Sequence, residues 1–238
     1  MSFTLTTSVF AVLTALVHVV AAKEFVDNVR QHYAENINDL LVKQIQKELS
    51  ASYIYQGYAS YFDRADVSLP GVAKFFSGAS LEEREHAQSL IDYINKRGGH
   101  AQFEKIDLKA SCELVWNYLT GESSDLGSFA SRRMCICGFV TTQAFNAQCE
   151  ERSVWKEALM AFEDALAIER FVNKELLDLH KEADARKDAH LAHILEHEFL
   201  EEQVSSISKL ARYVTRLRSF AGGNNYKLGE YIFDQHLS

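Results

Sequence analysis

Carboxylate and imidazole side chains interrupt the apolar faces of several amphipathic stretches in this sequence. Glu83 and His86 are three residues apart, so on a helix they stand one above the other on a single face. Other stretches place Glu48, Glu169 and Gln203 at helical spacing with apolar residues. Burying an isolated carboxylate costs several kcal/mol unless it is paired or bound to a cation. These positions therefore need a common explanation.

Metal ions held between the helices would remove these costs together. Glu83 and His86 match the Glu-x-x-His element of di-iron carboxylate bundles. Oxygen and imidazole ligands without a thiolate suit iron or manganese better than soft metals. Taken singly, each glutamate has a plainer interpretation as a boundary residue whose carboxylate reaches water. His86 alone could be a hydrogen-bonded core histidine, but such groups on four helices together favour a metal centre.

Long helices must position these groups, and the composition agrees, with one proline, 11 glycines and 47% apolar residues. Ser68 is the expected N-cap of the second helix and Asp188 that of the fourth. The expected helices cover about residues 34–63, 70–97, 155–187, 189–221 and, as a short final helix, 225–235.

The lengths of the connections predict how the helices are arranged. About six residues join the first two helices, which makes them antiparallel neighbours, whereas about 55 residues join the second and third, which lets these two run parallel. The expected fold class is therefore all-α, a four-helix bundle with a long crossover and a short fifth C-terminal helix, forming a single domain over residues 23–238.

Residues 1–22 contain no Lys, Arg, Asp or Glu and end in Val20-Ala21-Ala22, which fits a secretory signal peptide. The missing positive charge near the start departs from that pattern, and an N-terminal anchor or a mitochondrial leader are the alternatives. No later stretch is apolar enough to span a membrane. The net charge of −8 disfavours a nucleic-acid partner and suits solubility or cation binding.

Four cysteines lie in the long connection, within an insertion at about residues 110–150. In a secreted chain this even, clustered count indicates disulfides, and a structural zinc site is the alternative. Two of the cysteines are too close in sequence to bridge easily, which leaves two of the three possible pairings. The four are Cys112, Cys135, Cys137 and Cys149.

The sequence resembles the ferritin family over about residues 29–109 and 155–237. The long insertion and the leader have no counterpart in cytosolic animal ferritins, and both are similar to features of the secreted, yolk-type ferritins of molluscs. The resemblance rests on QIQKELSASYIYQGYASYFDRADVSL (44–69), AKFFSGASLEEREHAQSLIDYINKRGG (73–99), ALMAFEDALAIERFVNKELLDLH (158–180), HEFLEEQVSSISKL (197–210) and LGEYIFDQH (228–236).

This resemblance implies a complete ferroxidase centre. Glu83 would bridge two irons, the first also held by Glu48 and His86 and the second by Glu169. Gln203 would be a weaker ligand, and Tyr55 would hydrogen-bond nearby. Two Fe(II) would react with dioxygen and pass to a mineral core as Fe(III), inside a hollow shell of 24 identical or mixed subunits. Neither nucleic acid nor, after signal cleavage, a membrane is an expected partner.

The resemblance is incomplete at two further places. Glu82 and Glu85 match a family cluster thought to nucleate mineral, but its third position is Gln88, and plain solvation of this face stays an alternative. His193 and Glu196 match a channel normally lined by Asp and Glu, and a mostly neutral histidine predicts a less negative entry for Fe(II).

Three other functions are alternatives to a secreted ferroxidase subunit. The stretch HILEH at 193–197 matches the zinc motif of one protease class, but it needs a third ligand. A secreted helical-bundle signalling protein has no need of buried Glu and His. A storage or yolk ferritin loaded by another subunit would not need the complete ligand set. The expected location is extracellular, or yolk or another compartment of the secretory pathway.

Overall fold

The computed structural model describes residues 29–108, 110, 111, 114, 115, 118, 158–221 and 225–237. The expected signal peptide at 1–22 and all four cysteines lie outside the described residues, as does most of the insertion. The division of the chain into a leader and a single domain therefore stays a prediction.

The described residues form helices and no strand, as expected for an all-α bundle. The two observed helices before the crossover differ from the predicted ones by at most two residues at each end, and the last helix is longer by two residues at its C-terminal end. The elements in chain order are α2 (Glu35–Phe62), α3 (Pro70–Lys96), α6 (Ala158–Ala185), α7 (Ala189–Ile194), the π-helical segment η2 (Leu195–Leu200), α8 (Glu201–Ala221) and α9 (Tyr226–Leu237).

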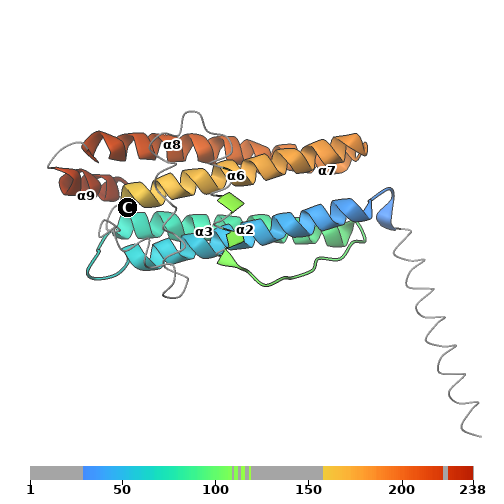
Figure 1. The fold of residues 1–238 in the computed structure, drawn as a ribbon, viewed down its shortest axis with the longest axis horizontal. Helices are drawn as coiled ribbons and strands as arrows, with labels where there is room; N and C mark the ends of the chain where they lie inside the picture. Colours follow the sequence, from blue (N-terminus) through green and yellow to red (C-terminus); the bar gives the residue numbers. More distant parts are fainter. Residues whose placement is uncertain are drawn as a thin grey trace, which may run out of the picture.

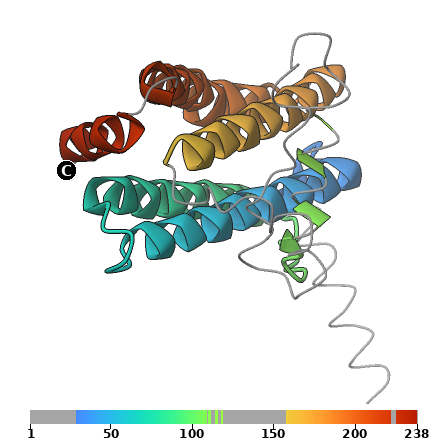
Figure 2. The same ribbon diagram turned by 60° about the vertical axis from the view of Figure 1, so that its left-hand side comes forward.

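The long helices form two antiparallel pairs that pack face to face (Figure 1). In the first pair, the Ser52 hydroxyl of α2 donates to the Ser80 carbonyl of α3 at 2.6 Å. In the second pair, the Arg218 guanidinium of α8 donates to Glu163 of α6 at 2.9 Å. The rotated view shows the same two layers, with α9 beside the end of the bundle (Figure 2).

Contacts between the layers fix the relative direction of α2 and α6. Near the middle of α2, the Lys47 Nζ lies 2.7 Å from Glu175 Oε2 of α6. Closer to the C-terminal end of α2, the Tyr58 hydroxyl donates to Asp164 of α6 at 2.8 Å. The partners on α6 run in the opposite order, so α2 and α6 are antiparallel. Because α3 is also antiparallel to α2, α3 and α6 are parallel, which confirms the prediction from the long connection.

Aromatic rings fill the core at the end of the bundle where α3 and α6 begin. The Phe76 ring lies 5.0 Å from that of Tyr58 and 5.1 Å from that of Phe162, measured between ring centroids. Phe233 of α9 meets Phe162 edge to face at 5.3 Å. Edge-to-face and tilted ring pairs add stability beyond their buried area. Through Phe233, α9 thus packs against the core at this end of the bundle.

Helix α9 also supplies the N-terminal caps of two parallel helices. The Asp234 carboxylate accepts the Val72 N–H at 2.9 Å, at the start of α3. The Glu230 carboxylate accepts the Ala158 N–H at 2.6 Å, at the start of α6. A negative side chain at a helix N-terminus satisfies unpaired N–H groups and complements the helix dipole. The fifth helix is thus fastened by charge as well as by apolar contact.

The prediction that Ser68 caps the second helix is wrong. Ser68 has a φ of 53°, in the left-handed region, and the residue at the cap position is Leu69, which makes no side-chain cap. The turn is closed instead by the Ser68 N–H, which donates to the Arg64 carbonyl at 2.8 Å. Since Asp234 binds the first turn from α9, a local cap is not required.

The predicted cap of the fourth helix is confirmed at the opposite end of the bundle. Asp188 accepts the Leu191 N–H at 3.1 Å. The same carboxylate receives both arms of the Arg97 guanidinium, at 3.0 and 2.9 Å, just past the end of α3. This pairing ties the end of α3 to the start of α7.

The π-helical segment η2 was not predicted from the sequence. The inward-facing residues before and through it are spaced by four, namely Leu191, Leu195, Phe199 and then Gln203, and all four are buried. In an ideal α-helix, positions four residues apart drift by about 40° around the axis at each step. The wider π turn takes up this drift, so Gln203 still faces the core.

None of the helices in the described part of the chain is long and apolar enough to cross a membrane.

The capping role of Asp234 can be tested by substitution. Asp234→Ala removes the acceptor for the Val72 N–H, and loss of an N-terminal cap should lower the stability by about 1–2 kcal/mol. Asp234→Asn keeps an acceptor oxygen and should lose less. The measurement is the guanidinium denaturation midpoint of the three proteins. Equal losses for Ala and Asn would contradict a capping role.

Candidate metal centre

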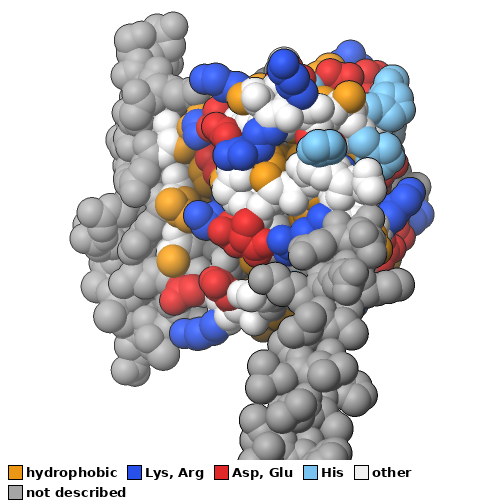
Figure 3. Space-filling model, turned by 90° about the vertical axis from the view of Figure 1, so that its right-hand side faces the viewer, with side chains coloured by type: hydrophobic (Ala, Val, Ile, Leu, Met, Phe, Trp, Pro, Cys, Tyr) orange, Lys and Arg blue, Asp and Glu red, His pale blue; other side chains and the backbone are white. Residues whose placement is uncertain are grey.

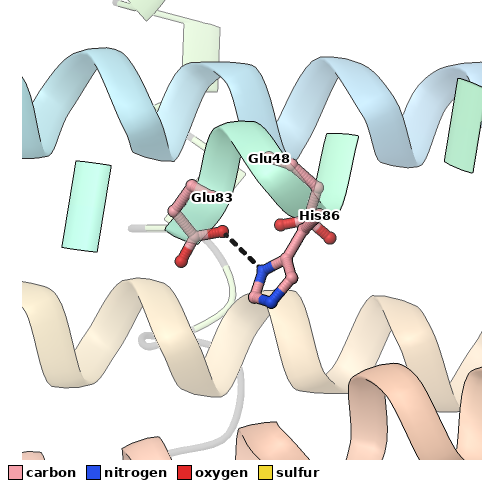
Figure 4. Close-up of side chains that lie close together, drawn as sticks. All are labelled: Glu48, Glu83 and His86. Atoms are coloured by element: carbon pink, nitrogen blue, oxygen red, sulfur yellow. Dashed lines mark hydrogen bonds and ion pairs between the residues drawn. The ribbon is translucent and has the colours of Figure 1, made fainter. Parts of the chain in front are cut away.

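Glu48, Glu83 and His86 come together near the middle of the bundle (Figure 4). One ligand atom from each lies within 4.8 Å of the others. Glu48 comes from α2, and Glu83 and His86 come from successive turns of α3. The two glutamates are only 1% and 4% exposed. A cluster of two buried carboxylates and an imidazole is a suitable donor set for a divalent iron ion.

The imidazole of His86 lies between two carboxylates. Its Nδ1 is 3.5 Å from Glu83 Oε2, and its Nε2 is 3.8 Å from Glu202 Oε2 on α8. The ring packs on Phe199 at 5.6 Å between centroids. The packing holds the ring beside Glu83, where the i, i+3 spacing places it.

Glu169 of α6 joins the same buried network. The Tyr55 hydroxyl donates to Glu169 Oε1 at 2.5 Å, and the side chain of Gln203 also hydrogen-bonds to Glu169. The carboxyl groups of Glu48 and Glu169 also lie close enough to that of Glu83 to act on it electrostatically. The structure therefore brings together all six residues that the sequence singled out around the centre. Their roles as ligands stay a prediction.

Burial raises the pKa of every carboxyl group in this network. Loss of hydration is the largest cause for Glu83, whose pKa lies well above its ordinary value, and the nearby charges of Glu169 and Glu48 raise it further. Burial also raises the pKa of Glu48. It raises the pKa of Glu169 to about 7, against the hydrogen bonds from Tyr55 and Gln203, which lower it. Without a cation, protons must neutralise this site.

Two buried side-chain oxygens in the described part of the chain have no hydrogen-bond partner, Glu48 Oε2 and Gln203 Oε1. Both belong to the cluster, and both residues are only 1% exposed. An unpaired buried acceptor costs about 1–3 kcal/mol. A bound cation would satisfy these oxygens, so their position fits the donor set to a metal.

Two neighbours of the cluster were missed by sequence reasoning. Gln44, buried one turn before Glu48, donates to Glu48 Oε1 at 2.7 Å. Its spacing of four from Glu48 is a signal that could have found it. Glu202 lies close to His86, but its half-exposed position next to Gln203 gave no pattern in the sequence.

The proposed nucleation residues lie on another face of α3. Glu82 and Glu85 are exposed, while Glu83 between them is buried. Gln88 is also exposed, and its amide donates to Asp92 at 2.8 Å. The division of this stretch into an inward and an outward face is therefore as predicted. A role of the outward face in nucleation stays a prediction.

The two predicted channel residues, His193 and Glu196, are exposed at the end of the bundle formed by α7 and η2. Glu196 Oε1 lies 2.8 Å from His180 Nε2 of α6. His193 instead lies beside His197, with 4.4 Å between their ring centroids. The two channel residues thus have different partners.

Comparisons with known proteins agree with this architecture. A family model described as a ferritin-like domain matches residues 38–220. Yolk ferritin of Lymnaea stagnalis is 70% identical over 209 residues, which are 87% of each chain. Soma ferritin of the same organism is 40% identical over 210 residues, or 88% of this chain and 95% of the relative. The ferritin middle subunit of Aquarana catesbeiana is 35% identical over 89% of this chain and 96% of its own.

The raised pKa of Glu169 predicts how the metal-free protein responds to pH. The folded state keeps a proton up to about pH 7, whereas the unfolded chain releases it near pH 4.5. Stability from this proton is fully present below the lower value and is lost as the pH rises through the higher one. In chelator-treated protein, the thermal midpoint should fall as the pH rises from about 4.5 to about 7, and Glu169→Gln should flatten that fall.

Glu182→Gln is the matched control, because Glu182 is an exposed carboxylate on the same helix. It should leave the dependence on pH unchanged. If Glu169→Gln and the parent protein lose stability at the same rate over this range, Glu169 does not hold the proton.

Proposed function

This chain belongs to the ferritin family, and on that premise we propose that it stores iron, oxidising Fe(II) itself at the centre between its helices. The observation that carries the proposal is the buried group of Glu48, Glu83 and His86, with one ligand atom of each within 4.8 Å of the others. Partnerless oxygens on Glu48 and Gln203 border the same space. A storage protein that received only Fe(III) would not need these buried acceptors.

In the proposed reaction, iron is the substrate, and each of two Fe(II) ions gives one electron to dioxygen. Glu48, Glu83 and His86 hold one ion, and Glu83 bridges to the second, which Glu169 holds. Gln203 offers its amide oxygen as a weaker ligand. Iron binding requires deprotonated ligands, so the protons that the buried carboxyls hold must leave as iron enters. The Fe(III) product then moves on to a mineral core.

Tyr55 has a positioning role in this proposal. Burial and the neighbouring carboxylates raise the pKa of Tyr55 well above its ordinary value, so its hydroxyl keeps its proton and donates to Glu169. This short hydrogen bond orients one Glu169 oxygen.

We propose that the chain assembles into a hollow shell of 24 subunits. Helix α9 supports this proposal, because it presents large apolar side chains to solvent while its other face is docked in the bundle. Exposed apolar groups on a helix mark a contact surface. The residues are Leu228, Tyr231 and Ile232, which are 59%, 57% and 44% exposed.

We also propose that the protein is secreted, with residues 1–22 as its signal peptide. The name of the yolk ferritin of Lymnaea stagnalis, 70% identical to this chain, supports yolk or another secretory-pathway compartment as the destination. A yolk store loaded by another subunit is the second candidate. The complete set of buried donors favours a subunit with its own ferroxidase activity.

Removing ligands from the centre tests the ferroxidase proposal. Glu83→Ala and His86→Ala should each reduce Fe(II) oxidation to the uncatalysed rate, because each removes a donor of the first ion. Oxygen consumption after aerobic Fe(II) addition measures the rate, and sizing on the same sample shows whether the shell is assembled. Asp92→Ala, an exposed carboxylate of the same helix, should oxidise iron normally. Oxidation at the original rate in both ligand variants would refute the assignment.

A second test concerns iron entry at His193. His193→Asp should speed iron uptake at low salt, because the negative charge of the added carboxylate attracts Fe(II). The gain should shrink as salt rises, since the screening length falls from about 30 Å at 0.01 M to about 8 Å at 0.15 M. His193→Asn matches Asp in shape without its charge and should give no gain. Equal uptake by all three proteins at every ionic strength would count against this route of entry.

A further inference from the structure

Gln44 is a buried amide directly beside the proposed iron centre. It is 1% exposed and lies on α2, one turn before Glu48. Exposed polar side chains, such as the histidines that gather at the end of the bundle formed by α7 and η2, have water as a partner (Figure 3). A buried amide needs partners inside the protein. Gln44 meets this need by donating from its Nε2 to Glu48 Oε1 at 2.7 Å.

This hydrogen bond makes the two oxygens of Glu48 unequal. Oε1 is held by the amide, whereas Oε2 is buried and has no hydrogen-bond partner. Glu48 also belongs to the cluster in which one ligand atom each from Glu48, Glu83 and His86 lies within 4.8 Å of the others. Side chains four residues apart on a helix are neighbours, so the backbone of α2 sets the direction from which Gln44 reaches the carboxylate.

We propose that Gln44 is a positioning residue for the first iron ion, which fixes the Glu48 carboxylate so that Oε2 is the oxygen presented to that ion. This inference rests on the proposed function, in which Glu48 is a ligand. Gln44 does not touch the ion and acts through Glu48. Groups that hydrogen-bond to metal ligands orient them, and losing such a group typically lowers metal affinity 10–100-fold.

A neutral donor suits this position better than a charged one. A lysine or arginine would also hold Glu48, but its positive charge would oppose a divalent cation in the same buried site. The amide holds one oxygen and leaves the negative charge of Glu48 to the ion. Glu169 is held in the same way, because the neutral Tyr55 hydroxyl donates to its Oε1 at 2.5 Å. Gln44 and Tyr55 are about three turns apart on α2, so one face of this helix orients both carboxylates.

The test measures anaerobic binding of Co²⁺, a divalent probe that dioxygen chemistry does not consume, to the full chain. Gln44→Leu removes the donor and keeps a side chain of similar size. It should weaken binding of the first Co²⁺ ion roughly 10–100-fold. The visible absorption of bound Co²⁺ should also change, because an unrestrained carboxylate can bind through both oxygens. If the leucine variant does not fold, Gln44→Met, which is unbranched like glutamine, takes its place.

A double-mutant cycle separates positioning from a merely structural role. Because Gln44 acts through Glu48, Gln44→Leu should cost no further affinity once Glu48→Ala is in place. Gln46→Leu is the matched control, since Gln46 is a half-buried glutamine of the same helix that donates to the Lys105 carbonyl at 3.1 Å. It should bind Co²⁺ as the parent does.

Two results would overturn the role of Gln44 alone. One is parent-like affinity in Gln44→Leu, and the other is an equal loss of affinity with and without Glu48. A parent chain that binds no Co²⁺ would instead overturn the iron centre, and the role of Gln44 with it. The failure of the inference is therefore distinguishable from the failure of the proposed function.

Discussion

The rest of the structure must offset one unfavourable free energy, which is that of burying three glutamates in one apolar bundle. Glu48, Glu83 and Glu169 lie on three different helices, and loss of hydration raises the pKa of each. Such a group is tolerable only when protons or cations neutralise it and when neighbours hold its oxygens. Tyr55 and Gln44 supply part of that support, and two oxygens are left over for an ion. The atoms of the proposed binding site are thus also the atoms that most lower the stability of the core.

Two polar fastenings of the bundle lie at its ends, away from the centre. At one end, Asp234 and Glu230 of α9 cap the two parallel helices α3 and α6. At the other end, the Arg97 guanidinium donates two hydrogen bonds to the Asp188 carboxylate at the start of α7. Both attachments act on helix termini, where backbone groups need partners. They fix the positions of helices along the bundle axis, and this fixes which turns of α2, α3 and α6 face one another at the centre.

Periodicity in the sequence was sufficient to find the helices and the polar residues on their apolar faces. The lengths of the connections predicted the helix directions, and the family resemblance added Tyr55 to the centre. Glu83 and His86 could be found because polar groups on an apolar stripe stand out at helical spacing. Ser68 was assigned wrongly because the true cap, Asp234, comes from a distant helix that no local pattern reveals. Glu202 was missed because it reaches His86 across the bundle from a half-exposed position. Local rules thus predict which face is buried, while partners supplied by other helices require the three-dimensional arrangement.

The π turn at Leu195–Leu200 sets the direction in which Gln203 faces, relative to the part of the helix that comes before it. Each residue of an α-helix advances about 100° around the axis. Restoring a regular α-helix here without removing a residue would turn the remainder of α8 by about that angle. Gln203 would leave the centre although no ligand had been substituted. A change that removes the π turn would therefore disturb the centre as much as the replacement of a ligand.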